Sequence, residues 1–195
     1  MIALLPSLDR FWRRNPAGYR PGEALDRLQR DLRPYACERH AIGALTLRLP
    51  QGPVITVRER PQSLFLAHIV SHRFSLNGGT ALTDALTLTI GVGGWLRRGA
   101  VRYRLVHAGS GGQRLLAALQ RYPQIGEALA QLDFRHAALT LRDGHWQLEL
   151  EHFAASEVVS RLPAGRRYLR LLPEQRRLLL SVCLMFSQLM EKLDE

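Results

Sequence analysis

The hydrophobic positions of this chain change their period near residue 44, and the change divides the predicted fold. Before it, Leu25, Leu28 and Leu32 recur at the spacing of an amphipathic helix, which Pro21 opens and Pro34 ends. After it, apolar and polar residues alternate, which is typical of strands with one buried face. The first part of the chain therefore predicts one helix followed by the start of a sheet.

Five strands are predicted between residues 44 and 107, and short turns join them. Asn77-Gly78-Gly79 is predicted as a hairpin turn between residues 64–76 and 82–92, because Asn and Gly accept a positive φ. Pro61 is expected to separate the second strand from the third. Parallel neighbours need crossovers of a dozen or more residues, so strands joined this closely are antiparallel.

The C-terminal half of the chain adds three helices and one more hairpin. Two short helices are predicted over residues 113–121 and 124–132, and Asp143-Gly144 is predicted to turn a hairpin between two strands. A linker over residues 163–165 then leads to a last helix over residues 174–193. The wide apolar face of that helix predicts that it packs across the sheet.

This order of strands, helices, hairpin and helix predicts an α+β fold. The sheet is expected to be antiparallel, with about five to seven strands, and the helices are expected to pack on one of its faces. A length of 195 residues fits a single domain over residues 1–195. Residues 1–21 contain three prolines and are expected to form an irregular N-terminal segment packed on that domain.

The charge of the chain points to anionic partners. Its formal net charge is +10, and all but one of its 27 basic residues are arginines, the exception being Lys192. Arginine suits bidentate contacts with phosphates and carboxylates, but a GC-rich genome would also enrich it. Either way the positive field attracts anions, and salt weakens that attraction.

Cysteine content and hydropathy exclude several classes of protein. Cys37 and Cys183 stand alone, which excludes a four-cysteine zinc site and a disulfide scaffold and fits a reducing cytoplasm. No apolar stretch approaches the roughly 20 residues that span a membrane. The chain also lacks a complete cofactor fingerprint, so no cofactor is expected.

The segment Ala108-Gly109-Ser110-Gly111-Gly112 comes nearest to a catalytic motif. It has the spacing of a nucleophile elbow, and Asp133 and His152 follow in the matching order, but a serine hydrolase needs a mostly parallel sheet. Ser110 is better explained as the N-cap of the following helix. A free helix N-terminus also favours anions. The predicted anion-binding residues are Arg102, Arg104, Ser110, Gly111 and Gly112.

Two pairs of ionisable residues are candidate sites. His68 and His72 are expected on a strand, roughly 13 Å apart and too distant to share a metal ion. Glu149 and Glu151 share a strand face and could form an acid–base pair of the glycosidase kind. An exposed strand face neutralised by His136 or Arg142 explains the glutamates better. No metal site is predicted.

Arginines and aromatic residues occur together in two further segments. One contains Trp95 and the strand around Tyr103, whose ring is expected on the face opposite Arg102 and Arg104, and the other contains Tyr168. Interleaved arginines and rings are typical of nucleic-acid platforms. The arginines of this alternative are Arg97, Arg98, Arg166, Arg167, Arg170, Arg176 and Arg177.

The N-terminal residues carry a resemblance. Phe11-Trp12-Arg13-Arg14 could dock on a membrane surface or a partner, or could cover the edge of the core. The longer stretch Leu5-Pro6-Ser7-Leu8-Asp9-Arg10-Phe11-Trp12-Arg13-Arg14 resembles a small family of uncharacterised proteobacterial proteins. The resemblance implies a bacterial, cytoplasmic setting and transfers no catalytic or binding residue.

The sequence thus favours a non-catalytic soluble protein that binds an anionic ligand or a protein partner through its sheet and glycine loops. Nucleic-acid binding by the arginine clusters is the first alternative, and a small serine hydrolase is the second. The oligomeric state is left open.

Overall fold

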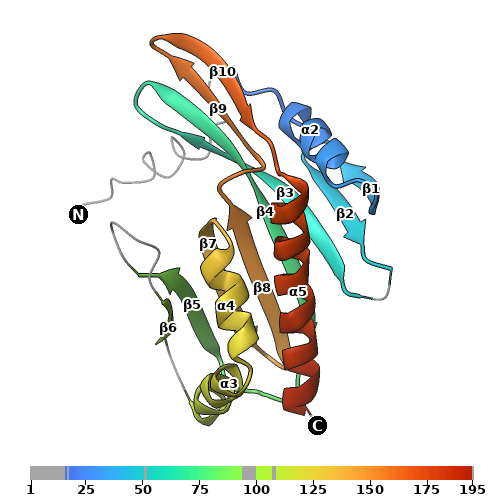
Figure 1. The fold of residues 1–195 in the computed structure, drawn as a ribbon, viewed down its shortest axis with the longest axis vertical. Helices are drawn as coiled ribbons and strands as arrows, with labels where there is room; N and C mark the ends of the chain where they lie inside the picture. The colour runs from blue at the N-terminus through green and yellow to red at the C-terminus, as the bar shows by residue number, and fades with distance from the viewer. Residues whose placement is uncertain (1–15, 17, 51, 94–99, 107–108, 195) are drawn as a thin grey trace, which may run out of the picture.

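The computed structural model describes residues 16, 18–50, 52–93, 100–106 and 109–194. Arg97, Arg98 and the segment 11–14 lie outside these residues. In the described part, four helices accompany a ten-stranded sheet (Figure 1). The elements in chain order are α2 (Glu23–Asp31), β1 (Ala36–Ala41), β2 (Ala44–Arg48), β3 (Val54–Ser63), β4 (Ala67–Gly79), β5 (Leu86–Val92), β6 (Val101–Val106), α3 (Ser110–Arg121), α4 (Pro123–Gln131), β7 (Phe134–Arg142), β8 (His145–His152), β9 (Ser156–Arg161), β10 (Ala164–Leu169) and α5 (Pro173–Asp194).

All strand pairings of the sheet are antiparallel. The main path runs β1-β2-β3-β4-β8-β7-β5-β6, and the first half of β4 also pairs with β9, which pairs with β10. The α+β class and the antiparallel sheet are confirmed, but the sheet has ten strands where five to seven were predicted. The missed strands are β1, β9 and β10, whose positions are mostly exposed or half-exposed and show no clean apolar alternation.

The predicted hairpin turn at residues 77–79 is wrong. These residues continue β4 and pair with β8, where Gly78 lies opposite Trp146. A Cβ built on Gly78 would lie 2.7 Å from Nε1 of Trp146, so the glycine makes room for the indole ring. The close approach of an aromatic ring across the strands, and not a positive φ, explains this glycine.

Pro61 also lies inside a strand instead of ending one. It pairs with Val70 of β4, whereas β2 pairs with β3 only over residues 54–58. One edge of β3 is thus unpaired at Pro61 within the described chain. Proline has no backbone N–H to donate, so it is tolerated at a position where the sheet needs no donor. Strand β3 therefore runs through the proline to residue 63.

The buried apolar side chains form one cluster that joins strands and helices. It includes Leu28 of α2, Leu119 of α3, Leu129 of α4 and Leu180 of α5, together with strand residues such as Leu148. Helix α5 contacts β4 and β8, and Figure 1 shows α4 and α5 lying over the sheet. The chain therefore has a continuous core along the length of α5.

The hairpin of β7 and β8 follows the sequence prediction. Asp143 and Gly144 have φ values of 51° and 71°, which suit a two-residue hairpin turn. His136 pairs with Glu151, as expected from that turn. Register in this hairpin is fixed locally, so it could be predicted from the sequence.

Replacing Gly78 with alanine should destabilise the protein by about 1–3 kcal/mol, because the new methyl group must displace the Trp146 ring. Urea denaturation would measure the change in the free energy of unfolding. Gly79→Ala is the matched control, since a Cβ there meets no atom within 4 Å. Equal losses in the two variants would contradict the role assigned to Trp146.

Candidate functional site

The sheet has a second face on which most side chains are polar. Along its strands, core residues such as Leu47 and Leu148 alternate with polar residues that are mostly half-buried or exposed. The pairing registers align these polar positions across seven neighbouring strands. We call this surface the open face. Its positions are Thr46, Arg48, Thr56, Arg58, Arg60, Ser71, Arg73, Ser75, Asn77, Gln147, Glu149, Glu151, His136, Ala138, Thr140, Thr87, Thr89, Arg102 and Arg104.

Two arginines of β3 are available on this face. Arg58 and Arg60 are exposed, and neither guanidinium makes an ion pair with any described residue. They line a shallow hollow of about 310 Å³ together with Arg73 and other polar residues of β3, β4 and β8. Sequence reasoning missed both arginines, although their alternation with Val57 and Glu59 was a signal. The hollow is a polar site on the open face.

The third arginine of the hollow is held by two carboxylates. Arg73 contacts Glu149 at 2.8 Å and Glu151 at 2.7 Å, and Nε2 of His136 lies 3.7 Å from Glu149. The guanidinium that pairs with both glutamates is therefore Arg73 and not Arg142, which pairs with Asp143, and His136 lies beside Glu149 alone. Arg73 was missed because the pairing of β4 with β8 was not foreseen. The glutamates thus form an ion-paired cluster with Arg73 and not a free acid–base pair.

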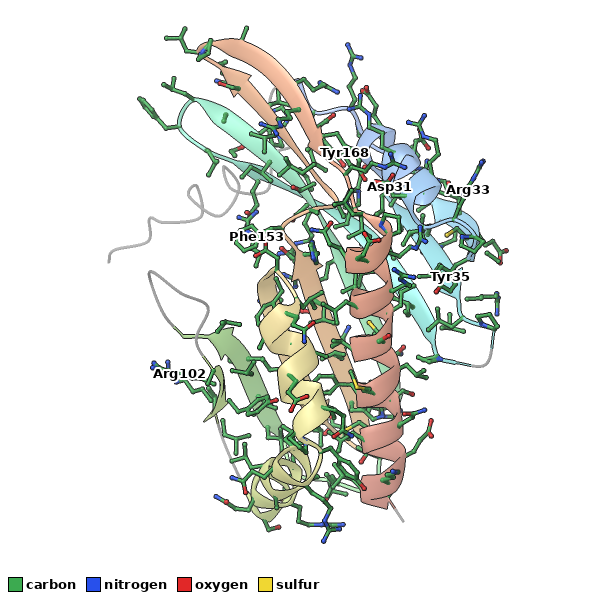
Figure 2. All side chains as sticks on the ribbon, viewed as in Figure 1. Asp31, Arg33, Tyr35, Arg102, Phe153 and Tyr168 are labelled. Atoms are coloured by element: carbon green, nitrogen blue, oxygen red, sulfur yellow. The ribbon has the colours of Figure 1, made fainter. Side chains whose placement is uncertain are left out.

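Arg102 and Arg104 lie on the same face at its far edge. Both are exposed on β6, and Arg104 belongs to a row that runs through Thr89, Ala138, Glu149, Ser75 and Thr56. In Figure 2 the labelled Arg102 points away from the ribbon. Five strand spacings separate β3 from β6, or roughly 24 Å. The predicted pair and the newly found pair therefore lie at opposite ends of one surface.

Tyr103 points the other way, as predicted. Its ring packs against the core cluster, and burial raises the pKa of its hydroxyl. The ring is therefore not placed to stack on a ligand of the open face.

A buried carboxylate holds the backbone between Arg58 and Arg60. The Glu59 side chain, 2% exposed, points to the opposite side of β3. It accepts hydrogen bonds from the Tyr19 hydroxyl at 2.6 Å and from the backbone amides of Gly22 at 2.8 Å and Leu25 at 3.0 Å. A carboxylate at the N-terminus of α2 is favoured by the free amides and the helix dipole. Glu59 therefore ties the strand that carries both arginines to α2.

The glycine loop before α3 contains an internal carboxylate. Asp84 accepts hydrogen bonds from the Gly111 amide at 2.7 Å and the Ser110 hydroxyl at 3.2 Å. The N-cap is Gly109, with no side-chain cap of its own, so the N-cap role predicted for Ser110 is wrong. Gly112 donates to the Gly109 carbonyl. A phosphate bound here would lie against the Asp84 carboxylate, and the two negative charges would repel each other. Anion binding by Ser110, Gly111 and Gly112 therefore stays a prediction.

The hydrolase alternative also lacks its structural setting. The Ser110 hydroxyl donates to an aspartate and not to a histidine, while Asp133 follows α4 and His152 ends β8. A nucleophile elbow needs a parallel strand before its helix, and no described strand pair is parallel.

The second arginine cluster is largely engaged within the protein. Asp31 accepts hydrogen bonds from the Tyr168 hydroxyl at 2.9 Å and from Arg170 at 3.0 Å, and Figure 2 shows Asp31 beside Tyr168. Arg166 pairs with Glu23 and Glu157. The remaining members differ: Arg176 donates to the Asp31 carbonyl, Arg177 lies 3.6 Å from Glu174, and Arg167 is exposed with no ion pair to a described residue.

A larger hollow lies elsewhere and is not an arginine site. It measures about 510 Å³ and lies against α5, between Tyr35, Leu49 and Leu184. Arg177 is the one arginine that lines it. Its position gives no support to a site built from several arginines.

Metal ligands are not gathered in the described part of the chain. His68 and His72 lie on β4, as predicted, and no group of three His, Cys, Asp or Glu residues there could hold a metal ion. Cys183 is buried, which raises the pKa of its thiol to about 12.

Fold and surface together define a class: an α+β protein whose antiparallel sheet presents a polar, arginine-bearing face. Residues 30–190 match the model of a family described as a protein of unknown function, DUF3156, and the chain belongs to that family. No curated protein and no solved structure matches it. Membership of an uncharacterised family is thus confirmed, while the proteobacterial origin stays a prediction.

The free energy of unfolding should fall as the pH falls below about 6.5. Burial lowers the pKa of His72, whose Nδ1 donates to the Ala155 carbonyl and whose Nε2 lies 4.0 Å from Glu59. Below that pH the unfolded chain binds a proton that the folded chain does not bind. The free energy of unfolding then falls by up to about 1.4 kcal/mol per pH unit for each such histidine. Burial also lowers the pKa of His68, which adds to the effect.

Urea denaturation between about pH 7.5 and 5.5 would test this, because the range brackets the unperturbed histidine pKa. His72→Asn keeps an N–H donor and should flatten the pH dependence, whereas His40→Asn at an exposed position should not. The same slope in wild type and His72→Asn would contradict the assignment.

Proposed function

We propose that this protein is a non-catalytic binding protein whose open face holds an extended anionic partner. The observation that carries the proposal is the pair of exposed arginines, Arg58 and Arg60, which have no ion pair among the described residues and line the polar hollow. Glu59 fixes their backbone from the other face, so the strand itself needs little ordering when a partner binds. Arg102 and Arg104 would contact the far end of the same partner.

This surface depends on how the helices are placed. We infer that they cover one face of the sheet and leave the other to the partner, and that the chain acts as one domain. The continuous core cluster, which joins α2, α3, α4 and α5 to the strands, supports both inferences. We further infer a cytoplasmic location from the two free cysteines, Cys37 and Cys183. No helix of the described residues is long and apolar enough to cross a membrane.

Nucleic acid remains the alternative partner, and the open face offers it only part of what it needs. Guanidinium groups at both ends suit phosphates. None of the positions that define the open face holds a Phe, Tyr or Trp ring on which a base could stack, and the imidazole of His136 lies against Glu149. We therefore favour a carboxylate-bearing ligand or protein segment over a single-stranded nucleic acid.

Changing Arg58 and Arg60 to alanine together should weaken the binding of a fluorescent polyglutamate peptide by about tenfold, because charged hydrogen bonds are lost. Fluorescence anisotropy at about 50 and 200 mM salt would measure the affinities, and labelled oligo(dT) would serve as the second probe. The control is Arg30→Ala with Arg121→Ala, two exposed helical arginines without ion pairs among the described residues. Both double variants lower the net charge by the same two units.

Equal weakening by the control pair would show that only net charge matters, which would overturn a site on the open face. Tighter binding of oligo(dT), with a steep salt dependence lost in the Arg58 and Arg60 variant, would favour the nucleic-acid alternative. Turnover in a broad hydrolase screen that Ser110→Ala abolishes would contradict the non-catalytic assignment.

A further inference from the structure

Two neighbouring hairpin turns carry a group of exposed apolar side chains. Leu64, Phe65 and Leu66, between β3 and β4, are 50%, 92% and 46% exposed, and Leu162, between β9 and β10, is 76% exposed. We call these four residues the tip patch. They account for four of the nine large apolar side chains that are exposed in the described chain, while the other five belong to separate segments.

The two turns are held side by side by strand pairing. Ala67 pairs with Ser160, and the backbone amide of Arg161 donates to the Leu66 carbonyl at 2.8 Å. The Leu64 amide closes its own turn by donating to the Ala67 carbonyl at 2.8 Å. Figure 1 shows both turns at the same end of the molecule. The tip patch is therefore built on a paired backbone from which its side chains project.

The charged residues that flank the tip patch along the chain are basic. Arg161 and Arg167 are exposed and make no ion pair with described residues, and the positive charges of Arg161 and Arg166 help to lower the pKa of nearby His68. No acidic residue occurs in residues 60–83 or 158–173. Apolar side chains at a projecting tip, with arginines behind them, match the two layers of a lipid surface that has anionic headgroups.

We propose that the tip patch inserts into the interface of an anionic membrane, with Arg161 and Arg167 binding its headgroups. Phe65 and the three leucines enter the boundary between headgroups and acyl chains, where their apolar area leaves water. The arginine side chains reach back to the phosphates. This surface is separate from the hollow on the open face, so the inference does not depend on the proposed function.

Flotation of the full-length protein with lipid vesicles tests the proposal. The wild type should float with phosphatidylcholine vesicles that contain phosphatidylglycerol, and should float far less with phosphatidylcholine alone. Phe65→Ser combined with Leu162→Ser should lower the partition coefficient by about tenfold or more, because two apolar side chains no longer enter the interface. Arg161→Ala combined with Arg167→Ala should lower it by about tenfold and reduce its salt dependence.

Ile42→Ser is the matched control, because Ile42 is 69% exposed in the turn between β1 and β2, outside the tip patch. It should leave flotation unchanged. A chain of net charge +10 could adsorb to anionic vesicles without insertion, and the apolar variants separate the two modes. In a Phe65→Trp variant, brominated lipids should quench additional fluorescence if the tip inserts.

Three results would overturn the proposal. The first is no flotation of the wild type with phosphatidylglycerol vesicles. The second is wild-type partitioning by the Phe65 and Leu162 variant, or an equal loss in Ile42→Ser. The third is sedimentation showing that the wild type self-associates and that Phe65→Ser dissolves the assembly without any vesicle binding, which would make the tip patch an interface between copies.

Discussion

The two-residue period of the antiparallel strands is the constraint on which the rest of the structure depends. Because successive side chains point to opposite faces, each strand sorts its residues into a core set and a surface set. The core set meets the helices in one cluster that runs from α2 to α5. The surface set is then aligned by the pairing registers, which bring Arg58, Arg73 and Glu151 into one row although they are far apart in the chain.

Carboxylates from distant parts of the chain fix the ends of the helices. Glu59 of β3 accepts the amides at the start of α2, and Asp84, in the segment before β5, accepts the Gly111 amide of α3. Both helices begin at glycines that supply no side-chain cap. The capping anion thus comes from the sheet side, which joins the position of each helix to the strands. Local sequence rules search for a cap within the helix itself and cannot find such partners.

This difference between local and distant determinants explains which predictions succeeded. The helix predicted between Pro21 and Pro34, the Asp143-Gly144 turn and the inward position of Tyr103 rest on spacing within a few residues, and they are confirmed, although the helix begins at Glu23 and not at Pro21. Gly78 was wrongly predicted to form a turn, because the side chain that requires a glycine there is Trp146, on another strand. Strands β9 and β10 lie mostly at exposed or half-exposed positions, so their sequence gives no apolar alternation. Among their arginines, Arg166 is held by distant acids, Glu23 of α2 and Glu157 of β9. The outward position of Arg102 and Arg104 could be predicted from alternation along one strand. The hollow beside Arg58 could not be predicted, because it forms only when β3, β4 and β8 pair.

The arrangement of charge on the open face fits the proposed role of its arginines in binding better than a role in stabilising the fold. Arg58 lies directly opposite Arg73, and like charges at opposed positions of a sheet are destabilising. Glu149 and Glu151 both pair with Arg73, whereas Arg58 makes no ion pair with a described residue. Codon usage can raise the number of arginines, but it does not choose this register position, where a threonine or an acid would favour the fold. The exposed Arg58 guanidinium, which no described residue holds in an ion pair, is consistent with the anionic partner proposed above.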